Sequence, residues 1–363
     1  MVRVTMASLL VVVLLLPFGS VLPQLGLSQA GRETVLERKE HVEADLAQDV
    51  PHVPPLCDGM PVSKQKVNVG DCRLYCEQEG EGTPLVLVNG GPGATHHYFH
   101  PYFSEAKDRF RVLYYDQRGC GLSDRRKGAG YSVDQAVDDL EHLREAVKID
   151  RWIVLGHSYG GTIAQCYAVK YPEHLAGLVL VDSAFYGLPV KASRTRQYDF
   201  VTSAETQAIQ QIQANRRLTP EQKLFNAHLN GDWKRQSFYR PSREELARLA
   251  LYEWKHDNAL RPAITRSLES LDLKGAFDEC PIPVLIMEGT WDLTWSADKS
   301  QQFARCFPAA KSVLFARASH SPFADEPENF FRALREFADG LPEDLSPEVA
   351  RWKEQLAERA HQK

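Results

Sequence analysis

The sequence predicts an α/β fold: a mostly parallel, eight-stranded sheet with helices on both faces and a helical insertion. Three observations lead to this prediction. Short, continuous apolar runs recur from residue 84 onward, as expected for strands buried on both faces. Segments of helical periodicity separate most of these runs. Between residues 185 and 277 the apolar runs stop, and segments rich in Arg, Gln and Glu with scattered aromatics take their place.

The elements are expected in the following order. An alternating hairpin, 64–69 and 72–78, turns at Gly70-Asp71. Buried strands follow at 84–88, 110–115, 152–155, 178–181, 284–287 and 312–315. Helices are expected at 132–147, 162–170, 297–306, 327–337 and 346–363.

These elements divide the chain into segments. The core of the domain covers residues 63–184 and 278–340, and a helical cap of residues 185–277 interrupts it. A C-terminal helix lies within residues 341–363. Residues 31–62 are charged and then Pro-rich, which is typical of a linker or of an arm lying on the domain.

The N-terminus resembles a secretory signal. Arg3 precedes the apolar run Ala7–Leu16, and Ser28-Gln29-Ala30 offers small residues before a cut after Ala30. We therefore expect residues 1–30 to be a signal peptide and the protein to be secreted or periplasmic, with no stable membrane insertion after cleavage. The alternative is an uncleaved membrane anchor running on to Leu27, which Pro17 weakens.

Composition limits the function classes. Hydrophobic residues make up 43% and charged residues 25% of the 363 residues, which is typical of a globular protein. The net charge of −5 gives no bulk attraction to nucleic acid. The sequence lacks a phosphate-binding G-x-x-x-x-G-K-S/T motif, so we expect no nucleotide cofactor. The expected partner is a small molecule or a short peptide, and the oligomeric state stays open.

A candidate nucleophile follows the strand at 152–155. The chain there reads Gly156-His157-Ser158-Tyr159-Gly160, which is G-x-S-x-G between a strand and a helix. In that setting a sharp turn exposes the serine hydroxyl. The alternative is that Ser158 caps the following helix.

A serine nucleophile needs a base and a group that orients the base. Asp292 follows the strand at 284–287, and His320 follows the strand at 312–315. The chain order Ser, Asp, His is the order that this type of sheet requires. Glu288 and Asp298 compete with Asp292 as the acid.

The loop Asn89-Gly90-Gly91-Pro92-Gly93 follows the strand at 84–88. Its glycines allow bare N–H groups to approach a substrate carbonyl. The N–H groups of Gly91 and Tyr159 are therefore the expected oxyanion-hole donors. A plain Gly/Pro turn is the alternative.

Three histidines follow this loop, at positions 96, 97 and 100. No Cys or carboxylate lies at ligand spacing beside them. We expect them to line the mouth of the pocket and to bind no metal.

The motifs "NGGPG", "DQRGCGLSD", "GHSYGG", "GTWDLT" and "SHSPFADEPENF" resemble those of the α/β-hydrolase superfamily, and more narrowly those of the proline iminopeptidase (prolyl aminopeptidase) family of serine peptidases. The resemblance runs from about residue 64 to 338. It implies a triad on Ser158, Asp292 and His320, a helical cap, and release of an N-terminal residue, often proline, from short peptides.

Two departures bear on the substrate. Asn89 stands where the family usually has His, and it can still donate and accept hydrogen bonds. The family's cap carries glutamates that hold the substrate's α-ammonium, and the nearest counterpart to its Trp-Glu motif is Tyr252-Glu253-Trp254. The expected substrate-binding residues are therefore Glu253, Trp254 and Asn89.

These observations predict an exported serine hydrolase that works through an acyl-enzyme, with an aminopeptidase preferred. A carboxylesterase or lactonase on small esters is the first alternative. A hydrolase-like protein that binds a ligand without turnover is the second.

Overall fold

The expected strands form one sheet in a computed structural model that describes residues 47–55, 60–126, 129–184, 202–235, 239–292 and 297–361. The strand order is β1-β2-β4-β3-β5-β6-β7-β8. β1 and β2 are antiparallel, β2 pairs with β4 antiparallel, and all other pairs are parallel. The fold class predicted from the sequence is confirmed. The strands are β1 (Ser63–Asn68), β2 (Arg73–Glu79), β3 (Thr83–Val88), β4 (Phe110–Tyr115), β5 (Trp152–His157), β6 (Leu175–Val181), β7 (Val284–Gly289) and β8 (Lys311–Phe315).

The parallel strands carry their following loops to one edge of the sheet. β3, β5, β6, β7 and β8 lie in register, as shown by the pairs of Leu85 with Ile153 and of Leu178 with Val284. Their carboxyl ends therefore meet at a single edge. The residues that follow these strands include every predicted member of the active site outside the cap.

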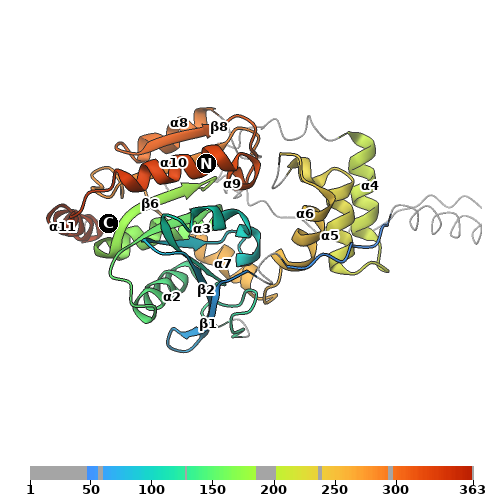
Figure 1. The fold of residues 1–363 in the computed structure, drawn as a ribbon, viewed down its shortest axis with the longest axis horizontal. Helices are drawn as coiled ribbons and strands as arrows, with labels where there is room; N and C mark the ends of the chain where they lie inside the picture. The colour runs from blue at the N-terminus through green and yellow to red at the C-terminus, as the bar shows by residue number, and fades with distance from the viewer. Residues whose placement is uncertain are drawn as a thin grey trace, which may run out of the picture.

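Side chains alternate between the two faces of the sheet, and each face has its own core. Val86 and Val88 face one core, while Leu85 and Leu87 face the other. Helices cover both faces (Figure 1). The first core includes residues of α2 (Val133–Ala146), α3 (Tyr159–Lys170), α8 (Ala297–Cys306) and α11 (Ser346–His361), and the second includes residues of η1 (His96–Phe99), η2 (Tyr102–Ala106), α9 (Pro322–Asp325) and α10 (Pro327–Asp339).

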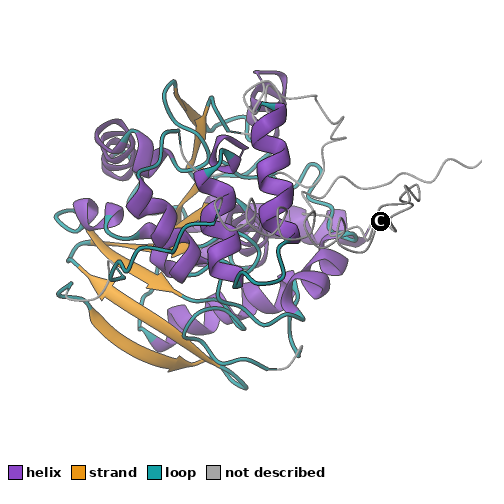
Figure 2. Cartoon of the chain, turned by 90° about the vertical axis from the view of Figure 1, so that its right-hand side faces the viewer, coloured by secondary structure: helices purple, strands orange, loops and turns teal. Residues whose placement is uncertain are grey.

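The insertion between β6 and β7 is helical and stands at one side of the sheet (Figure 1), and Figure 2 views the molecule from that side. Its longer helices begin with capping boxes, in which Thr202, Thr219 and Ser242 each bond the backbone three residues on. These signals explain why polar sequence forms helix here. The elements are α4 (Ser203–Ala214), α5 (Pro220–Leu229), η5 (Asp232–Arg235), α6 (Arg243–Arg248) and η6 (Leu249–Glu253), a π-helical turn that continues α6.

The chain contacts the core again before residue 277, where the sequence predicts the end of the cap. The chain returns to the core at residues 255–257, where Gly121 N–H donates to Lys255 O at 2.6 Å and Asp257 N–H donates to Gly119 O at 2.9 Å. α7 (Leu260–Leu268) then buries its apolar stripe in the core shared with α2. The boundary at residue 277 stays a prediction, since α7 has a helical pattern like that of the cap helices while its buried residues belong to the core of the sheet.

Part of the N-terminal arm lies on the cap. Gln48 N–H donates to Asn226 Oδ1 at 2.8 Å, and Tyr252 O–H donates to the Val53 carbonyl at 2.6 Å. The predicted signal peptide, residues 1–30, lies outside the described residues. In the part of the chain that the structure describes, no helix combines the length and apolar character needed to cross a membrane.

The aromatic and aliphatic core beside η2 and α10 should dominate stability. Leu334 of α10 is fully buried there, whereas Leu314 of β8 is 51% exposed. Leu334→Ala should lower the free energy of unfolding by about 2–5 kcal/mol. The matched substitution Leu314→Ala should change it by less than about 0.5 kcal/mol. Urea denaturation with equal m-values measures both, and equal losses would contradict this description of the core.

Candidate active site

Ser158 occupies a strained turn between β5 and α3. Its backbone has φ 55° and ψ −124°, in the region that L-residues rarely adopt. The crossing of strand and helix is tight: a Cβ on Gly160 would lie 2.0 Å from the Val88 carbonyl oxygen. The Ser158 side chain makes no capping bond to α3, so the helix-capping alternative does not hold. The hydroxyl is left half-exposed at the carboxyl edge of the sheet.

The loops after β7 and β8 pack tightly against each other. Trp291 N–H donates to Ala318 O at 2.9 Å, and a Cβ on Gly289 would lie 2.0 Å from the Ser319 carbonyl oxygen. This packing brings Asp292 Oδ2 to 2.5 Å from His320 Nδ1. The Asp292 carboxylate is almost fully buried, while the His320 side chain keeps 24% exposure. The arrangement is one that can hold an imidazole in a fixed orientation.

The competing acids are placed differently. Glu288 is buried and accepts a hydrogen bond from the Ser300 hydroxyl. The side chain of Asp298 lies outside the described part of the structure. Among the described carboxylates, Asp292 is therefore the one bonded to His320 Nδ1.

Ser158 and His320 lie on neighbouring segments but are not joined by a hydrogen bond between their described atoms. Among the described residues, no hydrogen bond joins the Ser158 hydroxyl to His320. The His320 loop nevertheless contacts the residue beside Ser158, since the His157 and His320 ring centroids are 4.8 Å apart. Nucleophile–base hydrogen bonds are often long without substrate. The structure thus joins two of the three predicted residues by a hydrogen bond and places the third on the adjoining turn.

Asp182 directly follows β6 at the same edge of the sheet, and the sequence analysis did not identify it. It is buried, and its carboxylate lies within 4.8 Å of the ligand atoms of Asp292 and His320. Its Oδ1 accepts from Gly289 N–H at 2.9 Å. Burial, and then the charge of Asp292, raise the pKa of Asp182 well above its usual range. Its position directly after a buried strand was the signal that could have found it.

The predicted oxyanion loop lies against the nucleophile. A Cβ on Gly90 would meet Ser158 Cβ at 2.7 Å and Ser158 Oγ at 3.3 Å, so only glycine allows this approach. Gly91 has φ 113°, which also favours glycine. Gly90 N–H is already used, donating to the Tyr98 hydroxyl at 2.7 Å. Gly91 N–H donates to no described group, and Tyr159 begins α3, where helix N–H groups favour negative charge.

Asn89 supports this loop from inside. It is fully buried, and its Nδ2 donates to the Ala94 carbonyl at 2.6 Å. Its own carbonyl accepts from Gln117 Nε2 at 2.5 Å. These hydrogen bonds hold the loop in shape, and the contact of Asn89 with substrate stays a prediction.

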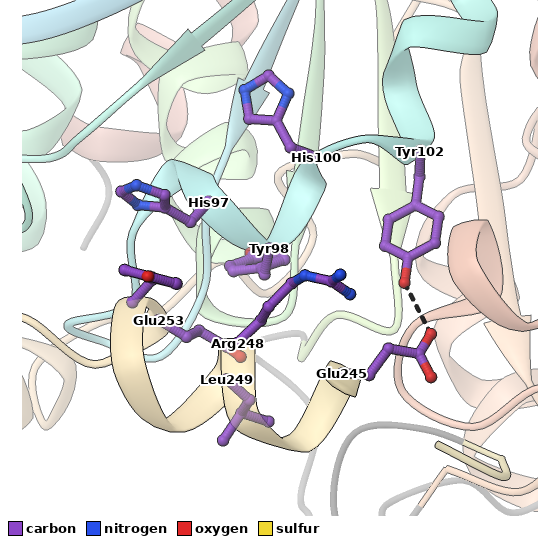
Figure 3. Close-up of a pocket in the computed structure, with 9 residues that line it drawn as sticks. His97, Tyr98, His100, Tyr102, Glu245, Arg248, Leu249 and Glu253 are labelled. Atoms are coloured by element: carbon purple, nitrogen blue, oxygen red, sulfur yellow. Dashed lines mark hydrogen bonds between the residues drawn. The ribbon is translucent and has the colours of Figure 1, made fainter. Parts of the chain in front are cut away.

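A pocket of about 40 Å³ lies between η1, η2 and the cap segment α6–η6 (Figure 3). Tyr98, Arg248 and Glu253 line it. Ser158, Asp292 and His320 do not line this pocket. Tyr98 connects the two places, because its ring lines the pocket and its hydroxyl bonds the oxyanion loop.

Glu253 is the most unusual charge in this pocket. The residue is buried, and burial alone raises the pKa of its carboxyl to about 8. Among the described residues, the carboxyl has no hydrogen-bond or ion-pair partner. A buried carboxylate without a partner is costly, so this side chain is suited to a cationic ligand. The neighbouring Trp254 instead stacks under Arg261, whose Cζ is 5.5 Å from the ring centroid, and does not line the pocket.

The expectation for the three histidines was wrong in part. His97 lines the pocket, and burial lowers its pKa to about 4. His100 also lines the pocket, and its Nε2 lies 3.0 Å from Glu77 Oε2. His96 is instead fully buried away from the pocket, with Nδ1 2.8 Å from Asp116 Oδ1. The sheet brings Glu77 to them from β2, which sequence spacing could not show.

Two groups of described residues place imidazole and carboxylate atoms close enough to consider a cation: Glu77 with His96 and His100, and Asp182 with Asp292 and His320. In both groups, imidazole nitrogens and carboxylate oxygens already pair with one another. These internal pairs account for the burial of the charges. We therefore assign no metal to either group.

Comparison with known proteins agrees with this fold. The family model described as the α/β hydrolase fold matches residues 83–327. The chain is 27% identical over 276 residues to the proline iminopeptidase of Saccharolobus solfataricus, covering 74% of this chain and 88% of that one. It is 27% identical over 295 residues to the proline iminopeptidase of Lactobacillus delbrueckii subsp. lactis, covering 77% and 98%.

Solved structures show the same architecture. An α/β fold family hydrolase from Bacillus anthracis superposes with a TM-score of 0.61 at 22% identity, covering 76% of this chain and 99% of that one. At that identity the likeness concerns the fold. The family match spans more than half of the sequence and includes strands β3 to β8 with the loops that follow them. The chain therefore belongs to the α/β hydrolase fold family.

Proposed function

We propose that this protein is a serine aminopeptidase that releases an N-terminal residue, proline or a similar small residue, from short peptides. The observation that carries the proposal is the buried Glu253 carboxyl, which lines a pocket joined through Tyr98 to the oxyanion loop. The similarity to proline iminopeptidases supports the same substrate class. Export of the protein, through residues 1–30, remains part of the proposal.

The proposed reaction uses Ser158, His320 and Asp292 in the following steps. His320 Nε2 takes the proton from Ser158 Oγ as the oxygen attacks the substrate carbonyl, and Asp292 stabilises the imidazolium that forms. The N–H groups of Gly91 and Tyr159 donate to the oxyanion. His320 then gives the proton to the leaving amine as the amide bond breaks. Water, deprotonated by His320, attacks the acyl-enzyme and releases the free amino acid.

Glu253 supplies the preference for an N-terminal residue. An internal peptide bond brings no charge to the pocket, so the desolvated carboxyl stays protonated and unpaired. An α-ammonium brings a positive charge that stabilises the carboxylate.

Asp182 helps to keep Asp292 in its ionised form. Two carboxylates this close do not both ionise at neutral pH, and the raised pKa of Asp182 leaves the proton on Asp182. Asp292 then keeps the negative charge that faces His320.

Labelling by a fluorophosphonate tests the hydrolase mechanism. The wild-type protein should react at Ser158, and Ser158→Ala should lose both labelling and turnover by several orders of magnitude. Ser270→Ala, which removes an exposed serine hydroxyl elsewhere, should label normally. Peptide mapping by mass spectrometry identifies the labelled residue. An unlabelled wild-type protein would favour a binding protein without turnover.

Glu253→Gln tests the substrate class. On prolyl p-nitroanilide, kcat/KM should fall about ten- to hundredfold, because a charged hydrogen bond to the ammonium is lost. On an uncharged p-nitrophenyl ester, it should stay within about twofold. Equal losses on both substrates, or turnover of the ester alone by the wild-type protein, would contradict the aminopeptidase proposal and favour an esterase.

The pH profile gives a second test of Glu253. Its pKa of about 8 means that the free enzyme holds a neutral carboxyl below that pH. The ratio of kcat/KM for the anilide to kcat/KM for the ester should therefore rise as the pH increases toward 8. At higher pH this ratio should fall, because the substrate ammonium, with a pKa of about 8, loses its proton. In Glu253→Gln the rising limb should disappear. A rising limb that persists would assign it to another group.

Asp182→Asn should change stability in a pH-dependent way. In the wild-type protein the folded state keeps a proton on Asp182 that the unfolded state releases above its ordinary pKa, so stability falls as pH rises. The variant has no such carboxyl and therefore no such fall in stability with pH. Urea denaturation should show that the free energy of unfolding of the variant, relative to that of the wild type, increases from pH 4 to pH 7. A difference that is constant with pH would show that Asp182 does not retain the proton.

A further inference from the structure

A chain of hydrogen bonds runs beneath the candidate site and joins its two functional loops. Gly90 N–H donates to Tyr98 Oη at 2.7 Å. Tyr98 Oη lies 2.9 Å from His157 Nδ1, and His157 Nε2 lies 2.5 Å from the carbonyl oxygen of His320. The chain therefore begins one residue before the proposed oxyanion donor Gly91 and ends on the backbone of the proposed base.

The direction of each hydrogen bond is fixed by its ends. The His320 carbonyl can only accept, so His157 carries its proton on Nε2. Burial, and then the charge of His320, lower the pKa of His157 to about 3, so the ring is neutral and Nδ1 accepts. The Tyr98 hydroxyl must then donate to Nδ1, which leaves its oxygen to accept from Gly90 N–H.

Apolar packing protects this chain from water. His157 is buried, and its ring centroid lies 5.5 Å from that of Phe323 and 6.4 Å from that of Phe99, both fully buried. Hydrogen bonds in such surroundings are stronger and hold their geometry better than those exposed to water. The three bonds therefore act as a fixed spacer between the loops after β3 and β8.

Tyr98, which lies within this spacer, also lines the pocket. Tyr98 lines the pocket together with Glu253 and Arg248 (Figure 3), and its hydroxyl belongs to the hydrogen-bond chain. A group that fills the pocket therefore contacts the residue that holds Gly90.

We propose that Tyr98 and His157 are positioning residues, which fix the distance between the oxyanion loop and the His320 loop and carry the effect of pocket occupancy to both. This inference rests on the proposed hydrolase function for its kinetic consequences, but the spacer itself can be detected without turnover. Its effect is expected on kcat, because it sets the alignment of groups that act in the transition state.

The kinetic test uses a double-mutant cycle. Tyr98→Phe and His157→Leu should each lower kcat about tenfold or more, with KM within about twofold, on the ester and on the anilide. The double variant should lose little more than the worse single variant, because each substitution already breaks the same chain. His157→Gln, whose amide can donate to one side and accept from the other, should recover part of kcat.

Tyr167→Phe is the matched control. The Tyr167 hydroxyl is also buried and also has two partners, Glu141 and Trp152, but it lies near the far end of α3. This variant should lose a similar amount of stability and keep its kcat. A similar fall in kcat for Tyr167→Phe, or multiplicative losses in the double variant, would overturn the proposal.

Amide hydrogen exchange tests the hydrogen-bonded spacer independently of catalytic activity. Protection of the Gly90 N–H should fall about tenfold or more in both variants, because Tyr98→Phe removes the hydroxyl that accepts this N–H and His157→Leu removes the ring that orients the hydroxyl. Unchanged protection in both variants would reject the spacer even if the enzyme is active. If the wild-type protein fails to react with a fluorophosphonate while protection falls as expected, the proposed function fails and the spacer stands.

Discussion

The close crossing of β5 and α3 at Ser158 is the constraint on which the candidate site depends. Glycines at positions 156, 160 and 161 let the helix begin directly above the strand, since a Cβ at each would lie within 2.5 Å of another atom. The turn holds Ser158 at positive φ and leaves its hydroxyl outside the helix-capping bonds. The same turn brings Ser158 against the loop after β3, where a Cβ on Gly90 would lie 3.3 Å from Ser158 Oγ. Strain at a residue of this kind persists because the surrounding backbone determines it.

Charge at the site is arranged in two separate layers. Near the sheet, Asp292 and Asp182 share one buried space, and His320 bonds the first of them. Beneath the cap, Glu253 lines a separate pocket, and its carboxyl has no hydrogen-bond or ion-pair partner among the described residues. Acyl transfer requires the first layer, and recognition of a free N-terminus requires the second. Tyr98 lies between them, so the proposed chemistry and the proposed specificity meet at one side chain.

Sequence reasoning predicted those parts of the candidate site that local patterns encode. Ser158 follows from strand, glycines and helix in one short segment, and Asp292 and His320 follow from chain order at the ends of buried strands. The parts it missed depend on contacts between distant segments. Asp182 gains its role only beside Asp292, and His157 only through Tyr98 and the His320 carbonyl. His96 and His100 face Glu77 across the sheet, which spacing along the chain does not reveal.

A crystal structure of the covalent fluorophosphonate adduct would test the central claim most directly. The account predicts phosphorus on Ser158 Oγ, with the phosphoryl oxygen about 3 Å from the N–H groups of both Gly91 and Tyr159. His320 Nε2 should face Ser158 Oγ while its Nδ1 keeps the bond to Asp292. A phosphoryl oxygen directed away from both N–H groups, or a His320 ring beyond hydrogen-bond reach of the Ser158 oxygen, would contradict the proposed assembly of the site.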